Sequence, residues 1–124
     1  MTILIILYSI NSLSFTKDKG RLLENAIYIY LRQLHLTLFY FREKGECDFV
    51  VFDQEKCVLA IQVCEEIHSD NKDREISGIL EALRFFNLKK GIIVTKNQKD
   101  DLQYDDIEIE LIPWYEFVLK SKLL

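Results

Sequence analysis

The stretch GECDFVVFDQEKCVLAIQVCEE, residues 45–66, decides the fold of this chain. It holds two short apolar runs, residues 48–52 and 58–64, which are separated by a polar turn signal at residues 53–56. A third β-prone run, residues 36–41, precedes them across another short turn. Links this short cannot make crossover connections, so the three runs predict an antiparallel meander.

On either side of this meander the apolar pattern takes the period of a helix. Before it, one apolar face predicts a helix that begins near Arg21, and after it the stretch SDNKD, residues 69–73, is a helix-start signal. The first face is formed by Leu23, Ile27, Tyr30, Leu31 and Leu34, and the second by Ile76, Ile79, Leu80, Leu83 and Phe86. The meander is therefore expected between two amphipathic helices.

The remaining segments complete an α/β pattern. Residues 91–95 are fully apolar and predict a central strand that is buried on both faces, whereas residues 96–106 predict a solvated loop. Residues 107–112 alternate Ile and Glu, which predicts an edge or half-exposed strand, and Pro113 suits the first turn of a final helix. With a short buried strand at residues 3–8, the elements predict an α/β fold: a mixed β-sheet flanked by helices.

Length, charge and cysteine use narrow the class of protein. The 124 residues predict a single domain over residues 1–124, in which residues 1–16 supply the N-terminal strand and a linker. The formal charge is −4, so nucleic-acid binding would need a local basic patch. The three cysteines form no Cys-x-x-Cys pair, which indicates reduced thiols and a cytoplasmic location. The N-terminal apolar run, about ten residues, is too short to span a bilayer, so we expect no membrane partner.

Two polar residues inside the apolar strands set the functional question. Asp48 opens the second strand of the meander, and Gln62 lies inside the third. Alternation along the strands predicts one face shared by Val58, Ala60, Gln62 and Cys64, and one shared by Asp48, Val50 and Phe52. Glu24 flanks the apolar stripe of the first helix and can lean over the same end of the sheet. We therefore expect Glu24, Asp48 and Gln62 to cluster, with Cys64 one step along the strand.

Six blocks of the sequence resemble a known family in the same order. They are GRLLENAIYIYL, ECDFVV, LAIQVCEE, REISGILEAL, GIIVT and IPWYEF. From about Lys17 to the end, the chain resembles the C-terminal domain of many archaeal and bacterial AAA+-type ATPases. That domain, of unknown function, is similar to the PD-(D/E)XK nuclease superfamily. The resemblance implies a restriction-endonuclease-like αβββαβ core.

The resemblance also assigns expected roles to the polar residues. The nuclease pattern has a helix acid, then a strand acid, then Asp/Glu-x-Lys on the next strand. By position these fall on Glu24, on Asp48, and on Gln62 and Cys64, so the last pair departs from the pattern. Glu24, Asp48 and Gln62 offer oxygen ligands for a weakly held Mg²⁺. A thiol cannot supply the positive charge of the missing lysine, so the resemblance implies a degenerate site that requires no cofactor.

Each of these residues also has a structural interpretation, and both interpretations stay open. Glu24 can pair with Arg21 on the helix surface, and Asp48 can accept backbone N–H groups at a turn. Gln62 can bridge neighbouring groups in a wet groove, and Cys64 can serve as a small buried hydrophobe.

Three functions compete on this evidence. The first is a degenerate nuclease-like module, part of an AAA+-type ATPase or a stand-alone remnant, that binds nucleic acid or a protein partner. The second is an active metal-dependent nuclease in which Lys56 or Arg74 replaces the missing lysine, and the third is a pure protein-interaction domain. The residues expected to contact DNA are Lys17, Lys19, Arg21, Lys44 and Arg74.

Two further expectations concern ATP and self-association. The four glycines are not spaced as a P-loop, so we expect no ATPase site in this chain. The aromatic residues around 114–117 are expected in the core, with a homodimer seam as the alternative.

Overall fold

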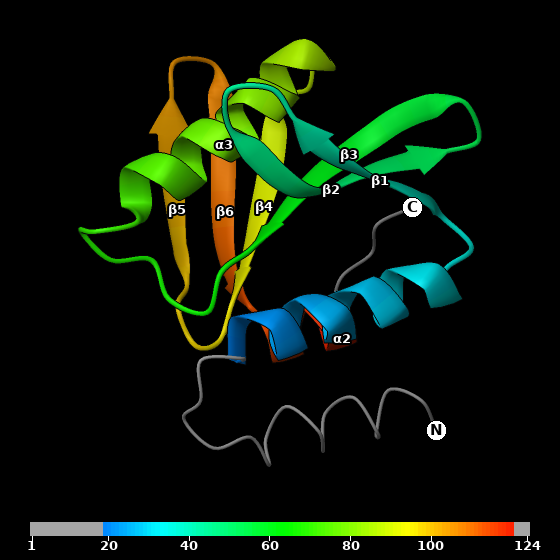
Figure 1. The fold of residues 1–124 in the computed structure, drawn as a ribbon, viewed down its shortest axis with the longest axis horizontal. Helices are drawn as coiled ribbons and strands as arrows, with labels where there is room; N and C mark the ends of the chain where they lie inside the picture. Colours follow the sequence, from blue (N-terminus) through cyan, green and yellow to red (C-terminus); the bar gives the residue numbers. More distant parts are fainter. Residues whose placement is uncertain (1–18, 121–124) are drawn as a thin grey trace.

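The computed structural model describes residues 19–120 and shows a mixed sheet between helices (Figure 1). The strand expected over residues 3–8 lies outside the described residues. In chain order the elements are α2 (Lys19–Gln33), β1 (Thr37–Arg42), β2 (Glu46–Asp53), β3 (Lys56–Val63), α3 (Lys72–Phe85), β4 (Lys90–Thr95), β5 (Asp100–Tyr104), β6 (Ile107–Pro113) and α4 (Trp114–Lys120). The order from α2 to β4 is the αβββαβ order that the resemblance implied, and the predicted α/β fold class is confirmed.

The six strands form one sheet in the order β1-β2-β3-β4-β6-β5. Strands β1, β2 and β3 are antiparallel neighbours, as the short links predicted, and β4 lies parallel to both β3 and β6. Helix α3 makes the crossover from β3 to β4 and covers one face of the sheet, while α2 and α4 cover the other (Figure 1). The result is three layers with a core on each side of the sheet.

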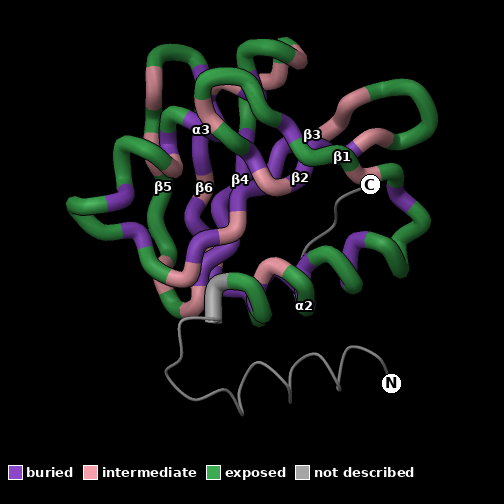
Figure 2. The backbone as a smooth tube through the Cα atoms, in the orientation of Figure 1, coloured by how far each residue is buried: buried purple, intermediate pink, exposed green. Residues whose placement is uncertain are grey.

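The two cores take alternate residues of the central strands, which are buried along most of their length (Figure 2). On one side, Ile27 and Leu31 of α2 pack with Phe117 of α4 and with Ile61 of β3. The other side is filled by α3 and by inward residues of the strands, namely Val50, Ala60, Ile76, Ile79, Leu83, Ile93 and Ile109. Strand β4 is buried from Gly91 to Thr95, so the prediction of a central strand is confirmed.

Two details of the sequence prediction are wrong. Residues 96–106 were expected to be a loop, but Asp100–Tyr104 forms β5, which pairs with β6 through a tight turn at Asp105. Strand β6 therefore lies between β4 and β5, and of the two alternatives predicted for it the half-exposed strand is confirmed, because buried residues alternate with more exposed ones along it. Leu34 was expected on the buried face of the first helix, but it lies beyond the end of α2 and is exposed.

Bulges in the meander shift the faces predicted from strict alternation. The pairing of β2 with β3 changes register between Val51 and Phe52, and Val58 packs with Leu59 against the α2-side core instead of sharing the face of Ala60. The pairing of β1 with β2 changes register between Phe39 and Phe41. Alternation therefore fails around Asp48, the residue on which the candidate site depends.

In the part of the chain that the structure describes, no helix has the length and apolar character needed to cross a membrane.

Candidate functional site

Strands β2 and β3 separate at one end of the meander, and side chains there replace the backbone ladder. The regular pairing ends at Phe49 and Ile61. Beyond it, the backbone N–H of Val63 donates to Oδ2 of Asp48 at 2.8 Å, and the backbone N–H of Asp48 donates to Oε1 of Gln62 at 2.8 Å. The two polar residues therefore satisfy backbone groups that the separation of the strands would leave unpaired.

The amide of Gln62 connects three elements. Its side-chain oxygen accepts from β2, and its Nε2 donates to the backbone oxygen of Glu46 at 2.9 Å and to that of Glu75 in α3 at 3.4 Å. The residue is only 3% exposed. Both amide hydrogens and the amide oxygen have partners, as a buried amide requires. A carboxylate at this position could not donate these two hydrogen bonds, and its negative charge would face the backbone oxygens of Glu46 and Glu75.

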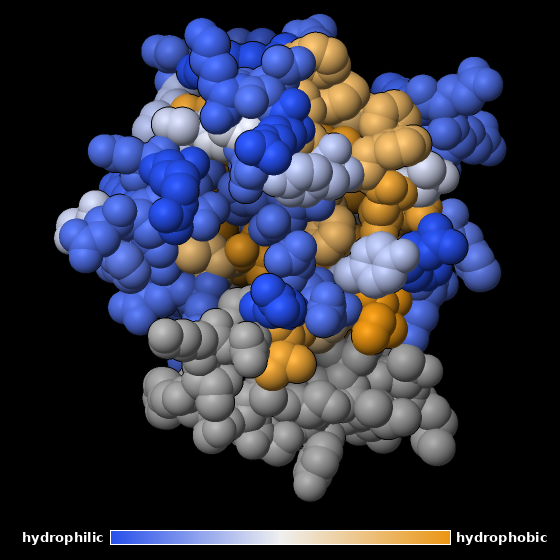
Figure 3. All heavy atoms as spheres, in the orientation of Figure 1, coloured by the Kyte–Doolittle hydropathy of each residue, from blue (hydrophilic) through white to orange (hydrophobic). Residues whose placement is uncertain are grey.

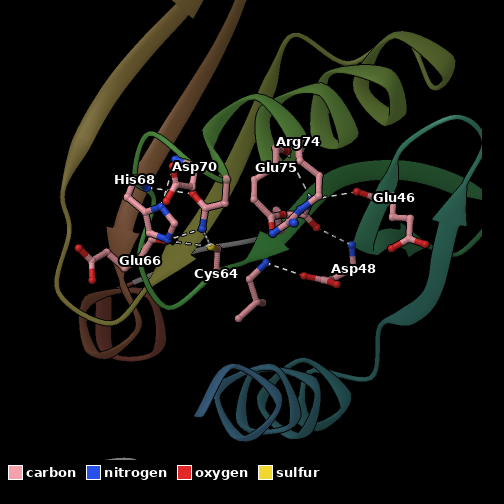
Figure 4. A network of polar contacts seen from close by, with 11 residues as sticks. Glu46, Asp48, Cys64, Glu66, His68, Asp70, Arg74 and Glu75 are labelled. Atoms are coloured by element: carbon pink, nitrogen blue, oxygen red, sulfur yellow. Dashed lines mark hydrogen bonds and ion pairs between the residues drawn. The ribbon is translucent and has the colours of Figure 1, made fainter. Parts of the chain in front are cut away.

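A cavity of about 590 Å³ opens where the strands separate. Its lining residues are Glu24, Arg42, Glu43, Lys44, Gly45, Glu46, Asp48, Gln62, Val63, Cys64, Glu65, Arg74 and Glu75. The structure thus brings together the four predicted motif positions: Glu24 from α2, Asp48 from β2, Gln62 from β3, and Cys64, which follows β3 directly. Figure 4 shows Arg74 and Glu75 reaching from the first turn of α3 into the space beside Asp48.

The cavity carries more negative than positive charge. Among the residues whose side chains the structure describes, six carboxylate residues line it against three basic ones, Arg42, Lys44 and Arg74. Arg42 lies 3.5 Å from the Glu46 carboxylate, and Arg74 lies 3.6 Å from that of Glu75. Two of the three cations are thus paired with acids of the same cavity, so a phosphate would meet a surface whose positive charge is largely compensated.

Burial and neighbouring acids make Asp48 a weak acid. Its pKa is raised to about 7, first by desolvation and then by the charges of Glu24, Glu75 and Glu46, although the Val63 N–H opposes the shift. Desolvation also raises the pKa of Glu75, against the attraction of Arg74. Near neutral pH the Asp48 carboxyl is therefore partly protonated, as expected for a buried carboxyl close to other carboxylates.

Cys64 is a neutral thiol at the position where a nuclease would need a cation. Burial is the main reason that its pKa rises to about 11, and the charge of Glu75 adds to the shift. The Sγ atom lies 3.3 Å from the backbone oxygen of Glu66, and Nδ2 of Asn71 donates to it at 3.5 Å. These contacts hold the thiol in the wall of the cavity, and it supplies no positive charge to a reacting group.

Two of the three predicted metal ligands also accept backbone hydrogen bonds. The oxygen of Gln62 already accepts the Asp48 N–H, and one oxygen of Asp48 accepts the Val63 N–H. Among residues 19–120, no group of three or more His, Cys, Asp or Glu side chains is arranged to hold a metal ion. The assignment of Glu24, Asp48 and Gln62 as magnesium ligands stays a prediction.

The residues predicted to contact DNA separate into two groups. Lys44 and Arg74 line the cavity, whereas Arg21 is exposed on α2 and does not line it. Lys17 lies outside the described residues, and the side chain of Lys19 is not described. In the described part of the chain, no ion pair joins Glu24 to Arg21, so the surface-pair interpretation of Glu24 finds no support.

Sequence reasoning missed the contribution of α3 to this site. Glu75 was not among the predicted site residues, yet its backbone oxygen accepts from Gln62 and its carboxylate lines the cavity. Glu81, two turns further along, accepts the backbone N–H groups of Lys44 and Gly45 and so holds the β1–β2 turn. The feature of the sequence that could have indicated this contact is the pair of glycines Gly45 and Gly78. Because they lack side chains, the β1–β2 turn and α3 can approach each other closely.

Comparison with known proteins gives one relative of unassigned function. The chain is 38% identical over 122 residues to the uncharacterized protein MJ1544 of Methanocaldococcus jannaschii. The match covers 87% of this chain but 26% of the relative, so the chain spans about a quarter of the length of the curated relative that it matches. No family model matches the sequence.

Proposed function

We propose that this chain is a nuclease-like module that does not hydrolyse phosphodiesters and that serves a longer polypeptide, or acts beside one, as a protein-binding domain. The observation that carries the proposal is the state of Gln62. The residue at the position of a required catalytic acid is a buried amide whose hydrogen bonds join β2, β3 and α3. It acts as a structural link, and Cys64 beside it is a neutral thiol.

The charge of the cavity favours a protein over a nucleic acid. Binding to nucleic acid depends on cations that neutralise phosphates, and two of the three cations here are paired with acids. A basic side chain of a protein partner would instead meet the carboxylates of Glu24, Asp48 and Glu75. The length of MJ1544, about four times the matched region, supports the interpretation that this fold serves as one module of a larger protein.

A cleavage assay tests the loss of hydrolysis. Single-stranded and duplex DNA and RNA are incubated with the chain and excess Mg²⁺ or Mn²⁺, and no product is expected beyond that of an Asp48→Ala control. Turnover that disappears in the Asp48→Ala variant would overturn the proposal. In that case Arg74, which lines the cavity and was one of the two predicted replacements, would be the candidate for the missing cation, and Arg74→Ala would then also lose activity.

A binding assay tests the preference for protein. Fluorescence anisotropy with labelled single-stranded and duplex DNA is measured between 50 and 200 mM salt, where phosphate contacts weaken steeply, by on the order of 10³-fold or more for several contacts. We expect no binding with this salt dependence. Tight, salt-sensitive binding that Arg74→Ala weakens would favour the nucleic-acid function instead.

A further inference from the structure

Five phenylalanine rings form a continuous cluster between the edge of the sheet and the end of α3. Phe39 of β1 contacts Phe52 with ring centroids 5.4 Å apart, and Phe52 contacts Phe86 at 5.6 Å. Phe86 in turn contacts Phe41 at 5.9 Å and Phe85 at 4.9 Å. The two ends are open to solvent, since Phe39 is 53% and Phe85 64% exposed. Figure 3 shows hydrophobic side chains gathered over this part of the molecule.

This aromatic cluster borders an open strand edge. Within the described residues β1 pairs with β2 alone, so one side of its backbone faces no strand. The opposite edge, β5, is short and begins with the exposed acids Asp100 and Asp101, which discourage further pairing. The middle of β1 carries no charge, and Tyr40 beside Phe39 is also more than half exposed. An edge of this kind offers both hydrogen-bonding groups and apolar surface to another strand.

We propose that β1 is the seam of a homodimer, in which a second copy pairs antiparallel with it about a two-fold axis at Phe39. In antiparallel strands related by such an axis, directly opposed residues lie on the same face of the sheet. Phe39 then faces Phe39 of the other copy, Leu38 faces Tyr40, and Thr37 faces Phe41. Each of these is an apolar or aromatic cross-strand pair of the kind that stabilises a sheet.

The charge of β1 is compatible with this partner, and the exposed aromatic area indicates that the dimer is weak. Arg42, the single charged residue of β1, falls opposite Leu36 in this register, so no two like charges face each other across the seam. An aromatic side chain covers about 150–250 Å² when buried, so the exposed halves of Phe39, Tyr40 and Phe85 contribute on the order of 300 Å² per copy. That is under half of the roughly 800 Å² per partner of a standard interface. We therefore expect a weak dimer, in the micromolar range, completed by the flanking residues of the strand and turn.

Sedimentation equilibrium of the full chain between 1 and 100 μM tests the seam. A reversible dimer is expected, and the double variant Phe39→Ser/Phe85→Ser should weaken it by about 30-fold or more, as removal of central aromatic residues does at interfaces. The matched control is Leu119→Ser on α4, where a side chain that is 62% exposed lies on another element and should not affect association. Circular dichroism of each variant confirms that the fold is retained.

A second variant and a second measurement keep the test decisive. Phe39→Lys places two ammonium groups face to face at the axis, so it should give a monomer at low salt and partial recovery of the dimer at high salt. Hydrogen exchange of the wild-type chain should slow at residues 37–42 on going from 1 to 100 μM and stay unchanged in α4. A monomer at every concentration, or a dimer that both variants leave intact, would overturn the proposal.

Discussion

Asp48 and Gln62 are joined by a hydrogen bond at the point where β2 and β3 separate, since the backbone N–H of Asp48 donates to the side-chain oxygen of Gln62. The Asp48 carboxylate in turn accepts from the backbone N–H of Val63, the residue after Gln62. Both residues also occupy positions that the resemblance assigns to the nuclease pattern, which Asp48 matches and Gln62 does not. Their hydrogen bonds show that the pair has a structural role whether or not the cavity binds a ligand. This dual position leads to predictions on stability, pH and reactivity.

Replacing the buried amide of Gln62 by the acid of the nuclease pattern should destabilise the protein. Gln62→Glu removes the donors to Glu46 and Glu75 and buries a charge beside Asp48, which should cost about 3 kcal/mol or more of unfolding free energy at pH 8. Urea denaturation measures the loss. Gln62→Met, which removes the hydrogen bonds without adding charge, is the control and should lose less. Equal stability of Gln62→Glu and the wild type would contradict the structural role.

The raised pKa of Asp48 predicts that stability falls with rising pH. The folded-state pKa is about 7 and the ordinary value is 3.8, so between these the folded state binds the proton more tightly than the unfolded state. Its contribution is therefore greatest at low pH, declines as pH rises through the window from about 4 to about 7, and is constant above it.

Asp48→Asn isolates this contribution, because the amide keeps an acceptor for the Val63 N–H and cannot ionise. We expect the variant to be more stable than the wild type at pH 8 by on the order of 2 kcal/mol and to lose this advantage near pH 4. Asp53→Asn, at an exposed position of the same strand, is the matched control. An advantage that is the same at both pH values would show that desolvation of the carboxylate is not its source.

The close approach of α3 to the β1–β2 turn predicts intolerance of a side chain at Gly78. A Cβ there would overlap the backbone oxygen of Glu46 and press against the Gln62 amide. Gly78→Ala should therefore lower the unfolding free energy by about 1–3 kcal/mol through overpacking, although alanine is the better helix former. Thermal unfolding measures it against Ser77→Ala, the exposed neighbour on the same helix. A stabilised Gly78→Ala variant would mean that helix and turn can move apart freely.

The cysteines should differ in reactivity. Burial raises the pKa of Cys47 to about 12 and that of Cys64 to about 11, so both remain thiols at pH 8. Cys57 is only partly buried and should be modified first by a thiol reagent such as a disulfide dye. Mass spectrometry of the labelled protein gives the order of modification. Rapid labelling of Cys64 before Cys57 would indicate an activated thiol in the cavity and would reopen the question of its chemistry.

The order of the elements from α2 to β4 and the convergence of the candidate residues could be predicted from the amino-acid sequence. The helical spacing of apolar residues, from Leu23 to Leu31 and from Ile76 to Leu83, is a local pattern that involves residues only a few positions apart. The short turns of the meander are likewise visible in the local sequence. Because those turns force β2 beside β3, Asp48 and Gln62 had to approach each other. Glu24 was brought to the same place by the apolar stripe that seats its helix on the sheet.

The hydrogen bonds of these groups and the surfaces that stay exposed depend on the tertiary structure. The residues of β5 are mostly polar, and they form a strand because they pair with β6. The local sequence pattern carries no sign of this pairing. Three further features depend on segments that are distant in the chain. They are the bulge that places Val58 on the opposite face of β3, the contact of Gln62 with Glu75, and the exposure of Phe39 at a sheet edge. Hydrogen-bond partners, burial and charge at a site are set by those distant neighbours, and for this reason the residue types alone left the role of Gln62 open.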